Sequence, residues 1–198
     1  MFRLIETIRL SNGQFNNLGY HEQRMNKAMR EIFGVDRNVR LEEMLNAHVK
    51  PSTGLYKCRL SYNNKMHEVE FSLYTIRPVR SLKIVRDDSI TYDHKFEDRK
   101  EIERNFGKRG DCDDVLFVKQ DRVTDSSQAN LVFRKGTVWS TPVSCLLPGT
   151  MRQSLLEAKS IREEEININE LSRFESFKLV NAMLLFDAPE SAIENIVP

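Results

Sequence analysis

The chain has 198 residues, of which 40% are hydrophobic and 30% charged, as in soluble globular proteins with room for one large or two small domains. Thirty basic and twenty-nine acidic residues leave a net charge of +1, which gives no general attraction to nucleic acid or membrane. Three widely spaced cysteines indicate neither a disulfide framework nor a metal site. Without a signal-like or membrane-spanning apolar run, we expect a reduced, cytoplasmic protein.

The first half of the chain predicts strands and helices in a simple order. Residues 3–10 alternate polar and apolar side chains, which predicts a strand, and the turn at 11–13 predicts a hairpin return over 14–18. Apolar residues at helical spacing predict a helix over 20–33, which Gly34 ends. Further along we expect a helix over 41–49, antiparallel strands over 54–62 and 68–74, and a linker at 77–80.

The second half mixes short strands and helices. After a strand that begins at 81–85, a helix is predicted over 95–108. The later predicted elements are strands over 115–119, 123–124, 131–133 and 137–141, a helix over 149–159, a strand over 161–168, a short helix over 168–173 and an apolar strand or strand-turn over 178–186. Together these elements predict an α+β protein of two domains, residues 1–80 and 81–198, with the chemistry mainly in the second.

Lys95, in Asp93-His94-Lys95-Phe96-Glu97-Asp98-Arg99, is the first candidate for a chemical role. A single lysine is usually a solvated surface charge, and a lysine that forms a Schiff base needs a depressed pKa. What singles out Lys95 is an acid and a Gly-Thr turn at fixed distances downstream. An amine, a partner for a pyridine nitrogen and a phosphate cradle together suit a pyridoxal phosphate site.

The acid is Asp125, which follows a strand-like segment and precedes Ser126-Ser127-Gln128-Ala129-Asn130. Alone it would be a turn aspartate, and Asn130 would brace the loop. The turn is Gly149-Thr150-Met151, where the start of a helix offers N–H groups to an anion. Arg24 lies on the predicted helix over 20–33 and is either a surface arginine or a phosphate clamp.

These stretches, together with 5–10, 21–24 and 180–183, run in an order and spacing similar to those of the class IV aminotransferase family. The chain resembles that family of pyridoxal-phosphate enzymes, and within it 4-amino-4-deoxychorismate lyase. The resemblance implies the two-domain fold of D-amino-acid aminotransferase, called fold type IV, shortened here at both ends. It also implies pyridoxal 5'-phosphate as cofactor, a small-molecule amino substrate and a homodimer.

The resemblance further implies roles for individual residues. Lys95 would hold the cofactor covalently and move protons as the catalytic residue, and Asp125 would face the pyridine nitrogen. The phosphate and ring would contact Arg24, Leu147, Thr150, the Met151 amide and Asn181. Two departures matter, because the family's acid is usually glutamate, one methylene longer than Asp125, and its second phosphate threonine is Met151 here.

Substrate recognition has the weakest signals. Arg59 lies on the predicted strand over 54–62, and its guanidinium could grip a substrate carboxylate, although a surface role fits equally well. Tyr62 on the same strand is a second candidate. The resemblance favours a lyase that releases pyruvate and gives 4-aminobenzoate, a folate precursor. An amino-acid transaminase of the branched-chain or D-amino-acid type, and a non-catalytic pyridoxal-phosphate-binding protein, remain alternatives.

Overall fold

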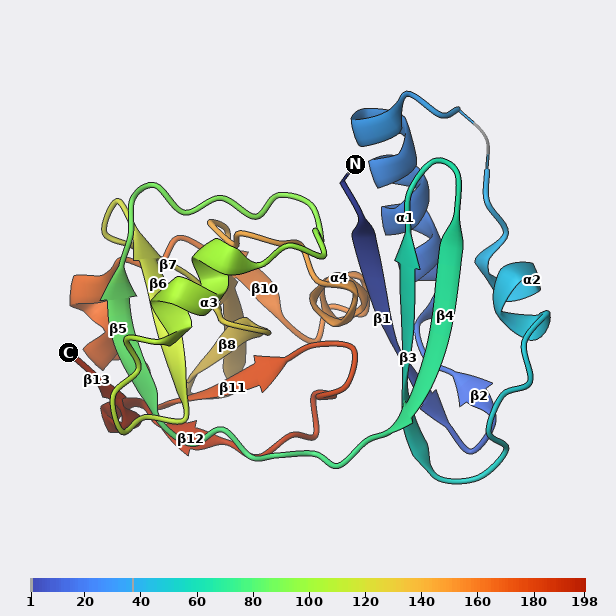
Figure 1. Cartoon of the computed structure of the whole chain (residues 1–198). Coiled ribbons are helices and arrows are strands. Elements are labelled where there is room, and N and C mark those ends of the chain that lie inside the picture. Colours follow the sequence, from blue (N-terminus) through green and yellow to red (C-terminus); the bar gives the residue numbers. More distant parts are fainter. Residues whose placement is uncertain (1, 37) are drawn as a thin grey trace. The chain divides into compact units, whose positions relative to one another are not determined.

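The computed structural model describes residues 2–36 and 38–198 and divides into two compact units (Figure 1). Unit 1 comprises Met1–Ile76 and His94–Asp98, and unit 2 comprises Arg77–Asp93 and Arg99–Pro198. Both units contain helices and strands, so the α+β class is confirmed. The division falls after Ile76, whereas the sequence places a boundary after residue 80, and the segment that carries Lys95 belongs to unit 1.

Unit 1 is built on an antiparallel sheet in the order β2-β1-β3-β4. The strands are β1 (Leu4–Ser11), β2 (Gln14–Phe15), β3 (Leu55–Tyr62) and β4 (His67–Leu73). Alternation places Leu4, Ile8 and Leu10 of β1 on one face, where all are fully buried. This face forms the unit's core together with side chains from the two helices α1 and α2.

The helix α1 (Leu18–Phe33) presents Met25, Ala28 and Met29 to that core, as the helical spacing predicts. Gly34 ends it in the left-handed conformation, with φ of 63°, and its N–H bonds back to the last turn. The next helix, α2 (Leu41–Asn46), is shorter than the predicted 41–49. Within the described residues, no helix is both long and apolar enough to cross a membrane.

The segment around Lys95 is extended, so the helix predicted from residue 95 is wrong at its start. The N–H of Ile5 donates to the carbonyl of Lys95, and the N–H of Glu97 donates to the carbonyl of Arg3, both at 2.9 Å. A bridge between Leu4 and Phe96 completes this pairing along β1. These long-range bonds override local helix preference, and α3 (Lys100–Phe106) begins only in unit 2.

Unit 2 contains a mixed sheet in the order β10-β9-β8-β7-β6-β5-β13, with β11 and β12 branching from β8. Its inner side chains and those of the 3-10 helix η1 (Ile168–Arg173) form a second core. The predicted strand over 161–168 is observed only as β10. The bounds of the strands are β5 Leu82–Arg86, β6 Asp114–Lys119, β7 Arg122–Ser126, β8 Asn130–Lys135, β9 Val138–Pro142, β10 Arg162–Glu164, β11 Ser176–Val180, β12 Ser191–Ala192 and β13 Ile196–Val197. Also in this unit are α4 (Thr150–Glu157) and η2 (Ile193–Asn195).

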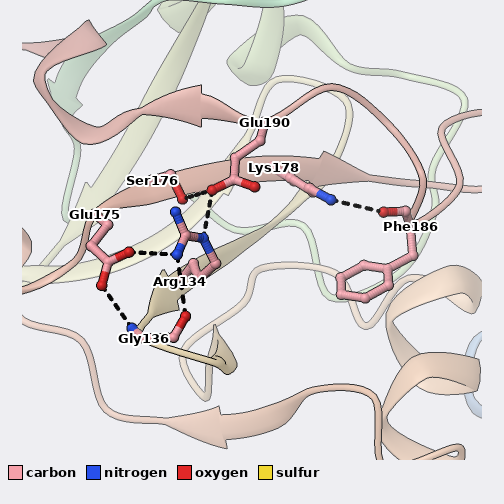
Figure 2. Close-up of polar contacts among 7 residues, drawn as sticks. All are labelled: Arg134, Gly136, Glu175, Ser176, Lys178, Phe186 and Glu190. Carbon is pink, nitrogen blue, oxygen red and sulfur yellow. Dashed lines mark hydrogen bonds and ion pairs between the residues drawn. The ribbon is translucent and has the colours of Figure 1, made fainter.

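A polar network on the surface joins β8 to the start of β11 and to the residue before β12 (Figure 2). Arg134 donates to Glu190 at 2.6 Å and to Glu175 at 2.5 Å, and Glu175 accepts from the N–H of Gly136. Farther along β11, Lys178 donates to the carbonyl of Phe186 at 3.2 Å. Exposed ion pairs of this kind contribute little each, so we assign the network a structural role.

Candidate active site

Asp125 and the start of α4 are joined by one side chain, that of Asn130. Asn130 Nδ2 donates to Asp125 Oδ1 at 2.7 Å and to the Leu147 carbonyl at 2.8 Å, and its Oδ1 accepts from the N–H of Gly149 at 3.1 Å. Asp125 and Asn130 also pair across the β7–β8 hairpin. The acid and the helix N-terminus are therefore held at a fixed separation within unit 2.

Asp125 is a buried acid with several donors around it. Its Oδ2 accepts from the N–H groups of Leu146 and Leu147, both at 2.9 Å. Burial raises the pKa of Asp125 to about 6, although hydrogen bonds from the Leu147 amide and Asn130 and the charge of Arg152 act in the opposite direction. With Asn130 these amides use three of about four acceptor sites, so Oδ1 can accept one more donor.

Gly149 is required where it stands because of close packing, not because of its backbone angles. Its φ of −69° suits any residue, but a Cβ built on it would clash with Oδ1 of Asn130. Any side chain at this position would push Asn130 away from both Gly149 and Asp125. The glycine thus allows the contact that ties the acid to the helix.

We therefore expect Gly149→Ala to lower the free energy of unfolding by about 1–3 kcal/mol, through overpacking and the loss of the Asn130 contacts. Urea unfolding of the protein without cofactor measures this change. Gly19→Ala is the matched control, because nothing lies within 4 Å of a Cβ at this position in α1. The control should be neutral or stabilising by up to about 1 kcal/mol. A Gly149→Ala protein as stable as the control would contradict the packing argument.

The sequence analysis predicts an anion site at the first turn of α4 (Thr150–Glu157). Gly149 is the N-cap, and Thr150 and Met151 are both buried, at 4% and 6% exposure. The positive end of the helix dipole lies at these residues, together with the hydroxyl of Thr150. The Met151 side chain packs into a small core with Val132, Leu155 and Val180, so it is the backbone of Met151 that a phosphate could meet.

Asn181 braces the loop that follows β11. Its Oδ1 accepts from the N–H groups of Met183 and Leu184, both at 2.8 Å, and its Nδ2 donates to the Gln128 carbonyl at 3.0 Å. Gln128 lies in the turn between Asp125 and Asn130. Asn181 is thus joined to the same loop system as Leu147 and Thr150, and its direct contact with a phosphate stays a prediction.

In unit 1, Lys95 is half-buried and its backbone is fixed by β1. His94 beside it lies 3.4 Å from Glu31 of α1 and its ring meets Phe96 edge-on, with the centroids 6.0 Å apart. Burial is the main cause that lowers the pKa of His21, and the nearby positive charge of Lys95 also acts in this direction. The structure therefore groups the predicted lysine with residues of α1.

Arg24 belongs to a buried polar cluster with Glu6 and His21. Glu6 accepts from Arg24 Nε at 3.0 Å and from Arg24 Nη2 at 2.5 Å, and His21 Nδ1 lies 2.5 Å from Glu6 Oε2. Burial alone would raise the pKa of Glu6, but the Arg24 charge and the His21 hydrogen bond lower it to about 2. Burial lowers the pKa of His21, although the hydrogen bond and charge of Glu6 act in the opposite direction.

The two tentative substrate residues differ in their surroundings. Arg59 donates to Glu97 at 2.6 Å, two residues beyond Lys95, and Ser61 donates to the same oxygen at 3.2 Å. Tyr62 is buried in the core of unit 1, and burial raises its pKa. A substrate carboxylate would have to compete with Glu97 for Arg59. The roles of both residues in substrate binding stay predictions.

The sequence analysis missed Glu6 and Arg152. Glu6 is the one acid on the face of β1 that carries Leu4, Ile8 and Leu10, and an acid at a core position of an alternating strand could have signalled it. Arg152 is 4% exposed and donates to the Pro142 carbonyl and to Glu163 at 3.0 and 2.6 Å. Nothing in its local sequence marks it, because those partners lie ten and eleven residues away.

Comparisons with known proteins identify the family of this chain. The sequence profile of the family described as amino-transferase class IV matches residues 99–186, a range that includes Asp125, Asn130, Gly149 and Asn181. An uncharacterized protein of Haemophilus influenzae is 33% identical to this chain over 185 residues, which are 92% of this chain and 98% of that protein.

Solved structures are similar over nearly the whole chain. A putative 4-amino-4-deoxychorismate lyase from Haemophilus somnus is 34% identical, with a TM-score of 0.86 over 92% of this chain and 97% of that one. A putative amino-acid aminotransferase from Mesorhizobium loti is 20% identical, with a TM-score of 0.78 over 96% and 99%. A hypothetical aminotransferase from Mycobacterium tuberculosis in a PLP-bound form is 16% identical, with a TM-score of 0.73 over 96% and 80%.

Proposed function

Because this chain belongs to the class IV aminotransferase family, whose enzymes share fold type IV, we propose that it is a pyridoxal-phosphate-dependent lyase. Its substrate would be 4-amino-4-deoxychorismate, and its products pyruvate and 4-aminobenzoate. The observation that carries the cofactor part of this proposal is the hydrogen-bonded path from Asp125 through Asn130 to the N-terminus of α4. It holds a carboxylate and an anion site at a fixed separation, as a ring nitrogen and a phosphate of one ligand require.

The donor set fits pyridoxal phosphate. Asp125 can accept one further hydrogen bond, the start of α4 has backbone amides and the Thr150 hydroxyl, and the resemblance to the family adds the guanidinium of Arg24. Leu147 would pack on the ring and Asn181 would support the phosphate loop. When bound, the cofactor supplies an electron sink for charge that develops on the substrate.

The chain's own residues would then perform the proton transfers. Lys95 would hold the cofactor covalently and, once released, take the proton from the amine-bearing ring carbon of the substrate. A proton delivered to the enol side chain lets pyruvate leave, and aromatisation of the ring drives the step. Asp125 in its ionised form would keep the pyridine nitrogen protonated throughout.

The lyase is favoured over the transaminase by the Haemophilus somnus structure, which is 34% identical, whereas the aminotransferase structures cited above are at most 20% identical and support the fold alone. The decisive experiment mixes the pyridoxal-phosphate-loaded protein with 4-amino-4-deoxychorismate in the absence of any keto acid. We expect pyruvate and 4-aminobenzoate in equal amounts over many turnovers.

The same assay distinguishes the alternatives. A transaminase would give no pyruvate without a keto-acid acceptor, and amino acids would convert its cofactor to pyridoxamine phosphate. A non-catalytic pyridoxal-phosphate-binding protein would bind the cofactor and respond to neither substrate. Either outcome would overturn the lyase proposal while leaving the family unchanged.

We also propose that the working unit is a homodimer in the cytoplasm, as the resemblance to the family implies. Analytical ultracentrifugation at micromolar concentration tests the oligomeric state. A mass near twice 23.1 kDa supports the proposal, and a monomer that retains activity contradicts it.

A further inference from the structure

Arg152 is a buried arginine in the first turn of α4, and its own hydrogen bonding is incomplete. Its side chain is 4% exposed, and Nη2 donates to the Pro142 carbonyl at 3.0 Å and to Glu163 at 2.6 Å. Its Nε is buried and has no hydrogen-bond partner among the residues that the structure describes. A buried unpaired donor costs free energy, and a positive charge is unfavourable at the positive end of a helix dipole. Arg152 therefore needs an explanation other than stability.

The segment 143–149, which joins β9 to α4, is held by two buried charged side chains of unit 2. Asp125 accepts from two N–H groups in the middle of the segment, both at 2.9 Å. Arg152 lies on the helix that follows the segment and donates to the carbonyl of Pro142, the residue directly before it. The carboxylate and the guanidinium thus bind the same short loop, where burial leaves little water to screen their attraction.

The ionisable groups around Asp125 come from several elements. Burial is the largest influence on Asp125 and opposes its ionised form, whereas the charge of Arg152 favours that form. Burial raises the pKa of the Cys145 thiol in the connecting segment to about 11, so this thiol is neutral at pH 7. From β6, Asp114 accepts from an N–H of the turn after β7, and from β10, Glu163 pairs with Arg152. Glu163 is 49% exposed, so water screens its charge more than that of Arg152.

We propose that Arg152 is a positioning residue that keeps Asp125 ionised, so that this carboxylate can pair with the protonated ring nitrogen of the cofactor. The inference rests on the proposed function and adds to it a residue that acts through Asp125. The positive charge offsets part of the cost of a buried carboxylate. Loss of charge and loss of loop structure are separable, because only the first shifts the pH at which Asp125 titrates.

The test measures the titration of Asp125 in the cofactor-free protein. The ¹³C signal of its carboxyl group is followed by NMR from pH 4 to pH 9 and is assigned by its absence from Asp125→Asn. The variants are Arg152→Gln, Arg152→Lys and Glu163→Gln, and circular dichroism verifies that each one is folded. Arg86→Gln, at an exposed arginine of the same unit that also pairs with an acid, is the matched control.

We expect Asp125 to titrate with a midpoint of about 6 in the wild-type protein. In Arg152→Gln the midpoint should rise to about 7, an increase of about tenfold in proton affinity. Arg152→Lys should stay within about threefold of wild type, because it keeps the charge. Glu163→Gln should lower the midpoint, because it removes a negative charge from the guanidinium. Arg86→Gln should match the wild-type protein.

Cofactor binding supplies a second readout. The dissociation constant of pyridoxal phosphate is measured by fluorescence at pH 6 and at pH 8.5. Arg152→Gln should bind about fivefold more weakly than wild type at pH 6, where less of its Asp125 is ionised. At pH 8.5, where Asp125 is ionised in both proteins, the two constants should agree. A loss of equal size at both pH values would overturn the proposal, because the charge of Asp125 would not be its cause.

Three further outcomes would overturn the inference in different ways. If the midpoint in Arg152→Gln equals that of wild type, Arg152 is only structural and the proposed function stands. If Glu163→Gln raises the midpoint, the effect passes through the loop and not through the charge, and this result decides alone if Arg152→Gln does not fold. If the wild-type protein does not bind pyridoxal phosphate, the proposed function fails and the role assigned to ionised Asp125 fails with it.

Discussion

Replacement of Lys95 by alanine is expected to lower the rate of pyruvate release by about 10⁴-fold or more. The variant would lose both the covalent hold on the cofactor and the proton transfers, each of which contributes strongly in enzymes. The fold should be retained, because the backbone bonds between this segment and β1 do not depend on the identity of the side chain at position 95.

The initial rates of pyruvate release by the wild-type protein and by Lys95→Ala are compared in the presence of saturating pyridoxal phosphate. Lys65→Ala, at an exposed lysine of the same unit, is the control and should retain the wild-type rate. A folded Lys95→Ala protein with a rate within tenfold of wild type would show that another group does the chemistry.

Replacement of Asp125 by asparagine is expected to change stability in a way that depends on pH. The pKa of Asp125 is raised from 3.8 to about 6 by burial, so the folded protein binds its proton more tightly than the unfolded chain does. The favourable contribution of Asp125 is thus fully present below pH 3.8 and is lost as the pH rises through 6. Between these limits, wild type should lose roughly 3 kcal/mol relative to Asp125→Asn.

Urea unfolding of both cofactor-free proteins between pH 4 and pH 7.5 measures this difference. Asp187→Asn, at an exposed aspartate of the same unit, is the control for the general effect of removing an acid. An equal free-energy difference at all pH values would contradict the burial argument. The same Asp125→Asn variant should bind pyridoxal phosphate about 100-fold more weakly, because an amide cannot neutralise a protonated pyridine nitrogen.

The Asp125→Asn substitution is thus expected to raise stability at neutral pH but to weaken the binding of pyridoxal phosphate. These opposite effects bear on why an acid lies at position 125. At neutral pH its charge opposes folding and, on the proposed function, favours cofactor binding. A stability cost at a buried ionisable group is a frequent feature of functional sites. Asp125 is also shorter than the glutamate usual in the family, and its bonds to the Leu146 and Leu147 amides hold it close to its own loop.

Local patterns predicted much of this structure. The helix ending at Gly34, the short helix over 168–173 and the strand–turn–helix around Gly149 agree with the sequence analysis, because caps, turns and periodicity are local signals. The helix predicted from Lys95 was wrong, since backbone bonds from Arg3 and Ile5 decide that segment. No short window of sequence contains those partners.

The features of the candidate site likewise divide into those that local motifs predict and those that depend on contacts between distant residues. Ordered motifs predict Lys95, Asp125 and Thr150 as site residues, and Asn130 is expected to brace its loop. The double link of Asn130 to Asp125 and Gly149 depends on residues nineteen positions apart. Glu6 was missed because the alternation of β1 was clear while the side that faces the core was not, and its partner Arg24 is eighteen residues away.

The central claim is that this protein binds pyridoxal phosphate covalently through Lys95, and one measurement tests it directly. The purified protein is incubated with pyridoxal phosphate, reduced with borohydride and digested for peptide mass mapping. The account predicts a single pyridoxyl adduct on Lys95, which is absent from Lys95→Ala. No adduct, or adducts scattered over surface lysines, would contradict it.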